Sequence, residues 1–206
     1  MSPLVEGLLA GYGIAIPVGA VAVLIVDTAV RAGFPMGFIA GAGAATADLL
    51  YAVLASMAGA ALTAALAPVA APLRIIGGLV LMTLAGSRLW RGLQRSGPPD
   101  QSAHAGAPLK VYAQFLGLTV INPLTIIYFT AFMVGRGAST AQYTLLSNLL
   151  FTAGVGLASL SWQTLLAALG GLAGKRLSAR FRSLATVLGN LLVLALGARS
   201  LVMALR

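Results

Sequence analysis

Apolar runs about 20 residues long recur along the whole chain, and short polar stretches separate them. A run of this length is what an α-helix needs to cross a hydrocarbon core about 30 Å thick. Because 59% of the 206 residues are apolar and 8% are charged, too little polar surface is available to coat a soluble globule of this size. The runs do not alternate apolar and polar residues with period two, which disfavours a membrane β-barrel. The sequence therefore predicts an all-α integral membrane protein.

Six transmembrane helices are expected, at residues 4–26, 36–59, 73–91, 110–134, 142–170 and 183–205. The third spans the bilayer only if Arg74 and Arg88 extend their side chains to the two interfaces. A polar loop at 92–109, rich in Gly, Pro and Ser, divides the single membrane domain into a first three-helix repeat, 1–91, and a second, 110–206.

The two halves resemble each other in sequence. Aligning the sequence with itself at an offset of 106 residues pairs Pro17 with Pro123, and an offset of 111 pairs Gly78 with Gly189. Since each half has an odd number of spans, the second enters the membrane from the opposite side. These features predict two inverted repeats, as in many secondary transporters, with a binding site near the bilayer midplane.

The net charge of +9 comes from basic residues that flank the apolar spans. Their distribution indicates the orientation of the protein in the membrane, and no nucleic-acid partner is expected. Nine of these residues fall on loops 1–2, 3–4 and 5–6 with their adjoining span ends, against four on the other side. The positive-inside rule assigns the nine to the cytoplasm and both termini to the outside. No Lys or Arg precedes the first apolar run, so a cleaved signal peptide is not expected. The nine are Arg31, Arg88, Arg91, Arg95, Lys110, Lys175, Arg176, Arg180 and Arg182.

The chain lacks the residues that several classes of protein function require. The chain has no cysteine, and its one histidine, His104, lies in the polar loop, which leaves no intramembrane Ser-His hydrolase or His-based metal site. A GxxxxGK[ST] phosphate loop is missing as well. No enzyme activity, cofactor or bound metal is expected, and any transport would draw on an ion or solute gradient.

Asp48, in "GAGAATADLLYAVLA", is the one acid predicted to lie well inside a span. A carboxylate at mid-bilayer costs about 2.5–3.5 kcal/mol on insertion scales, so such residues usually mark ion or solute pathways. We hypothesise that Asp48 binds a cationic group of a solute, takes up a coupling proton, or does both in turn. The alternative is a neutral Asp that hydrogen-bonds a neighbouring helix for stability alone.

Two prolines lie at the same depth as Asp48. Pro17, Asp48 and Pro123 are each 12 or 13 residues into a span, roughly 18–20 Å from the surface at a rise of about 1.5 Å per residue. Each proline removes a backbone donor and frees carbonyl groups, and Asn122 adds an amide at the second break. Such breaks can hold an ammonium group at freed carbonyls or a carboxylate at a half-helix N-terminus. A simple helix kink is the alternative.

Other polar and aromatic side chains in the spans are weaker candidates. Tyr51 follows Asp48 by three positions and so shares its helical face, where it could line the same cavity or only pack. Gln163, Trp162 and Asn190 are expected to make interhelical hydrogen bonds and packing contacts.

In these elements the chain resembles the LysE family of bacterial amino acid exporters, over nearly its whole length. The likeness is carried by "IPVGA", by the Asp48 segment, by "FLGLTVINPLTIIYF" and by the closing "VLALGARSLV". It implies proton-driven export of amino acids or related metabolites, with site residues at Pro17, Gly19, Asp48, Asn122 and Pro123. Many members have Pro-Gly-Pro where this chain has Pro17-Val18-Gly19, and a basic residue where Leu124 stands, which leaves the substrate open.

The primary interpretation is a six-helix secondary transporter of the bacterial inner membrane that exports amino acids or similar solutes, with protons and the lipid bilayer as its other partners. Small-residue faces could also support a homodimer. The alternatives are an exporter of metal cations from a related superfamily and a non-transporting membrane scaffold. One intramembrane acid without buried His or Cys is a poor path for a soft metal, and a scaffold has no need of a mid-membrane Asp.

Overall fold

The computed structural model describes residues 2–16, 19–66, 70–94, 107–122, 125, 128, 144–176 and 179–204. Within these residues the chain forms seven helices and no strand. The helices are α1 (Pro3–Ala15), α2 (Ala20–Ala32), α3 (Phe34–Leu66), α4 (Ala70–Gln94), α5 (Pro108–Val120), α7 (Leu145–Arg176) and α8 (Ala179–Ala204). The expected all-helical class is confirmed for this part of the chain. The polar loop lies largely outside it, as do Pro17, Pro123 and most of the second half of the fourth span.

The first expected span is two helices rather than one. α1 ends at Ala15, α2 begins at Ala20, and the two are bent by 80° at the break. Gly19 caps α2 from an extended conformation, with φ −108° and ψ −177°. α2 continues to Ala32, where Gly33 ends it with φ +85°, a left-handed conformation that favours glycine. The break that the sequence predicts is present, and the helix after it extends further than expected.

Two helices are long and apolar enough to cross a bilayer: Phe34–Ser56 of α3 and Leu145–Gly174 of α7. The bent pair α1 and α2 counts as a third if it forms one broken span. Shorter apolar stretches occur at Gly78–Ser87 in α4 and Val187–Leu196 in α8. The described residues thus contain two or three spans by length and composition, and the six-span arrangement stays a prediction.

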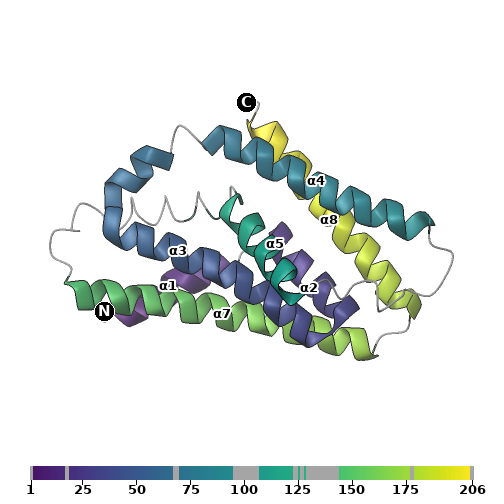
Figure 1. Cartoon of the computed structure of the whole chain (residues 1–206), viewed down its shortest axis with the longest axis horizontal. Helices are drawn as coiled ribbons and strands as arrows, with labels where there is room; N and C mark the ends of the chain where they lie inside the picture. The colour runs from purple at the N-terminus through teal and green to yellow at the C-terminus, as the bar shows by residue number, and fades with distance from the viewer. Residues whose placement is uncertain are drawn as a thin grey trace.

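The helices form two pairs with two shorter helices between them (Figure 1). α3 packs along α7, and α4 packs along α8, while α2 and α5 lie between these pairs. A cluster of buried apolar side chains joins the layers, including Leu24 of α2, Phe115 of α5, Leu81 of α4 and Val193 of α8. The remaining helix, α1, packs along α7.

Glycines allow the closest helix contacts. Gly154 of α7 lies against the backbone of Leu4 and Leu8 in α1, and Gly43 of α3 lies against the backbone of Tyr112 and Leu116 in α5. At both glycines a Cβ atom would overlap backbone atoms of the facing helix. Close approach through small residues is a main source of helix association where lipid removes the hydrophobic driving force.

Candidate functional site

Asp48 lies where α3 and α7 pack together. Its side chain is 3% exposed, and the hydroxyl of Ser159, on α7, donates a hydrogen bond of 2.6 Å to Oδ2. Ser159 is fully buried. A buried carboxyl group needs hydrogen-bond donors or a positive charge to offset its loss of hydration. The serine supplies one donor, so the other carboxyl oxygen can interact with a proton or a bound cation.

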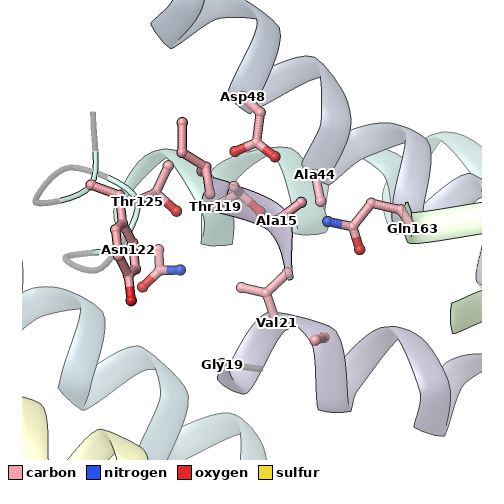
Figure 2. Close-up of a pocket in the computed structure, with 12 residues that line it drawn as sticks. Ala15, Gly19, Val21, Ala44, Asp48, Thr119, Asn122, Thr125 and Gln163 are labelled. Atoms are coloured by element: carbon pink, nitrogen blue, oxygen red, sulfur yellow. The ribbon is translucent and has the colours of Figure 1, made fainter. Parts of the chain in front are cut away.

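A pocket opens beside the carboxyl group of Asp48 (Figure 2). Residues of five helices line it, together with Gly19, Asn122, Thr125 and Tyr128, which lie outside these helices. The helical residues are Ile14 and Ala15 of α1, Val21 and Ala22 of α2, Ala44 and Asp48 of α3, Thr119 of α5 and Gln163 of α7. Its free volume of about 40 Å³ holds roughly three water molecules. Entry of a larger solute therefore requires the helix ends around the pocket to move apart.

The pocket brings together both breaks that the sequence predicts. Gly19, at the start of α2, and Asn122, two residues after the end of α5, line it together with Asp48. Pro17 and Pro123, the other two predicted residues at the breaks, lie outside the described residues. Three of the six candidate residues thus line one pocket, whereas the equal depth of Pro17, Asp48 and Pro123 stays a prediction.

Tyr51, the sixth candidate, is buried but is not among the lining residues. Its hydroxyl donates a hydrogen bond of 2.6 Å to the carbonyl oxygen of Val120, the last residue of α5. Carbonyl groups in the last turn of a helix have no intrahelical donor, so this bond satisfies one of them. Tyr51 therefore anchors the end of α5 to α3 and positions the segment that carries Asn122.

A Tyr51→Phe variant should unfold at a lower temperature than the native protein, because the Val120 carbonyl loses its donor. We expect a loss of about 0.5–1.5 kcal/mol, the usual net worth of one hydrogen bond. Thermal unfolding of the purified protein in detergent measures it. Tyr12→Phe is the matched control, since the hydroxyl of Tyr12 bonds Ser161 at an exposed position. Equal melting temperatures for the two variants would contradict the anchoring role.

Gln163 and Thr119 are among the lining residues that were not assigned to the site from sequence. Gln163 was expected to make interhelical bonds or packing contacts, and Thr119 was not singled out. Both are buried, at 6% and 4% exposure, and both line the pocket. Gln163 Oε1 and Thr119 Oγ1 have no hydrogen-bond partner in the part of the chain that the structure describes.

A second buried acid is Asp27, which the sequence places near a span end. In the structure it is 6% exposed within α2, and Arg31, one turn later, donates from Nε to its Oδ1 at 2.9 Å. It does not line the pocket. Asp27 therefore has a basic partner, whereas no ion pair involves Asp48 among the described residues.

Helices of bilayer length, a buried carboxyl group and a pocket between two interrupted helices together characterise membrane carriers of small solutes. A family model described as LysE type translocator matches residues 13–203. The chain therefore belongs to the LysE type translocator family, and it is a multi-pass membrane protein that acts on a small-molecule solute. No curated protein and no solved structure matches it significantly.

Proposed function

We propose that this protein exports amino acids or related small metabolites across the bacterial inner membrane in exchange for protons. The observation that carries the proposal is the position of Asp48. Its carboxyl group is buried between the two helices of full bilayer length and lines the pocket where both helix breaks meet. An acid in this position can bind either a proton or a cationic group of the solute.

The exchange follows from the cost of a lone charge in the membrane. With a proton on Asp48, or with the ammonium group of a solute beside it, the charge of this carboxylate is compensated. With neither, the buried carboxylate is uncompensated, because no basic residue is among the described lining residues. Reorientation of the pocket is therefore favoured when it is loaded and disfavoured when it is empty and ionised. This coupling makes protons move inward as solute moves outward.

The contacts between helices support the proposed inverted repeats. The offset of 111 residues that pairs Gly78 with Gly189 also pairs Gly43 with Gly154, and Asp48 with Ser159. Gly43 and Gly154 make corresponding contacts, each against a carbonyl oxygen and the amide nitrogen four residues later on the facing helix. Asp48 and Ser159 bond each other across the α3–α7 contact. These pairs are what an approximate twofold axis through that contact would produce.

The topology proposed with these repeats has 1–91 and 110–206 as the two halves, the loop 92–109 in the cytoplasm and both termini outside. Its support is the distribution of Lys and Arg along the sequence. A homodimer through small-residue faces stays a prediction from sequence.

The function is tested with the purified full-length protein in liposomes loaded with radiolabelled L-amino acids. Acidifying the outside should drive release of at least one amino acid faster than from protein-free liposomes, because proton entry pays for solute exit. A protonophore should remove the acceleration. Release that is independent of the pH gradient would contradict proton coupling. A failure to release any of the twenty standard amino acids under either condition would contradict amino acid export.

A further inference from the structure

We propose that the pocket recognises both charged groups of one small zwitterion. Asp48 binds the ammonium group, while the first turn of α2 and the Gln163 side chain bind the carboxylate. The inference deepens the proposed function and rests on it, since it assigns the two ends of an amino acid to opposite walls of the same pocket.

The acidic wall is formed by Asp48. It is the one acidic residue among the described lining residues. Ser159 donates to one carboxylate oxygen, which directs the remaining acceptor capacity towards the pocket. Thr119 Oγ1, buried and without a partner in the described residues, adds a neutral acceptor to the lining. An ammonium group brings three donors, which suits a wall of acceptors.

The opposite wall is the N-terminus of α2. Gly19, Val21 and Ala22 line the pocket, and α2 is 13 residues long. Its N-cap is glycine, so no side chain caps the first turn. Amides in the first turn of a helix have no intrahelical acceptors, and the helix dipole places partial positive charge there. This end of α2 is therefore suited to a carboxylate.

Gln163 is the independent observation that points to a ligand. Figure 2 shows its amide projecting into the space between Asp48 on one side and Val21 on the other. It is more than nine-tenths buried, and Oε1 has no hydrogen-bond partner within the described chain. Burying a polar atom without a partner is unfavourable unless a ligand or water satisfies it. Oε1 is an acceptor, so an ammonium group or a water molecule satisfies it, whereas the amide nitrogen carries two donors that can reach a carboxylate held at the start of α2.

Equilibrium binding to the purified full-length protein in detergent tests the inference. A screen of the twenty standard L-amino acids identifies the tightest binder, which is then compared with its decarboxylated amine and its deaminated acid. Both analogues should bind at least about tenfold more weakly, because each leaves one wall of the pocket without a partner. An amine that binds as tightly as the amino acid would overturn the assignment of the carboxylate.

Substitution of Gln163 tests its side of the pocket. Gln163→Glu should weaken amino acid binding at least about tenfold, because like charges oppose, while the decarboxylated amine should bind no more weakly than before. Gln163→Met keeps the approximate length of the side chain without its polar amide and should weaken amino acid binding several-fold. Gln114→Glu is the matched control, since Gln114 of α5 is not a lining residue.

The outcomes separate this inference from the proposed function. Native affinity in both Gln163 variants, or equal losses for the amino acid and the amine in Gln163→Glu, would overturn the inference even if pH-driven export is observed. Binding that discriminates as expected, without export in liposomes, would support the inference and contradict the transport function. Failure of all twenty amino acids to bind would overturn the inference.

Discussion

An Asp48→Asn variant is expected to fold and insert normally but to show no pH-driven solute release above that of protein-free liposomes. The amide is nearly isosteric with the carboxyl group and can still accept the hydrogen bond from Ser159, so the α3–α7 contact should be kept. It cannot take up and release a proton, and it offers no charge to an ammonium group. Release from liposomes under an imposed pH gradient measures the loss.

The control for this prediction is Asp27→Asn, which neutralises the other acid that is buried among the described residues. Asp27 does not line the pocket, and its partner Arg31 is 26% exposed and can be hydrated when it is unpaired. We expect this variant to retain coupled release. Elution as a single peak in detergent and native helix content by circular dichroism establish that both variants fold. Native rates of pH-driven release by Asp48→Asn would contradict every role proposed for the carboxyl group.

The sequence predicts those parts of the site that are energetically unfavourable in a membrane helix by themselves. An acid in an apolar run and a proline within a span are unfavourable in lipid whatever surrounds them, so Asp48 and the two breaks could be recognised without a structure. Gly19 and Asn122, which adjoin the breaks, lie with Asp48 in one pocket. The depth estimate itself concerned Pro17, Asp48 and Pro123, and it stays a prediction because both prolines lie outside the described residues.

The hydrogen-bond partners of Asp48 could not be recognised in this way, because which side chains reach it depends on how the helices pack. Thr28, Thr46 and Thr164 each donate to the carbonyl oxygen four residues earlier, as hydroxyl groups in membrane helices commonly do. Nothing local distinguishes Ser159 from them, yet it bonds Asp48 on another helix. Tyr51 was correctly placed on the face of Asp48, but the carbonyl group that it reaches comes from α5.

Helix ends were misplaced for a related reason. The expected fifth span ends at residue 170, yet α7 continues through Gly170, Gly171 and Gly174 to Arg176. Glycines usually weaken a helix, but these three face α2 and Phe34, where an added Cβ atom would overlap atoms of the neighbouring helix. They permit close packing and do not end the helix. A sequence read one helix at a time cannot separate these two uses of glycine.

A Gly43→Ala variant tests whether such contacts hold the pocket together. The new methyl group would overlap the carbonyl oxygen of Tyr112 and lie 3.0 Å from the amide nitrogen of Leu116, and backbone atoms cannot rotate away. Overpacking of this kind typically costs about 1–3 kcal/mol. We expect a lower melting temperature in detergent, by about 2–4 °C for each kcal/mol lost in a chain of this length.

Gly117→Ala, on the facing helix α5, is the matched control. Within the described residues nothing lies within 4 Å of a Cβ atom built at Gly117, so the methyl group meets no described neighbour. Alanine is also the better helix former, by about 0.8–1.0 kcal/mol in a helix interior, so this variant should melt at or above the native temperature. Because displacement of α5 from α3 would move Thr119 and Asn122 relative to Asp48, only Gly43→Ala should also bind solute more weakly. Equal stability and binding in the two variants would show that the close contact at Gly43 does not determine the geometry of the pocket.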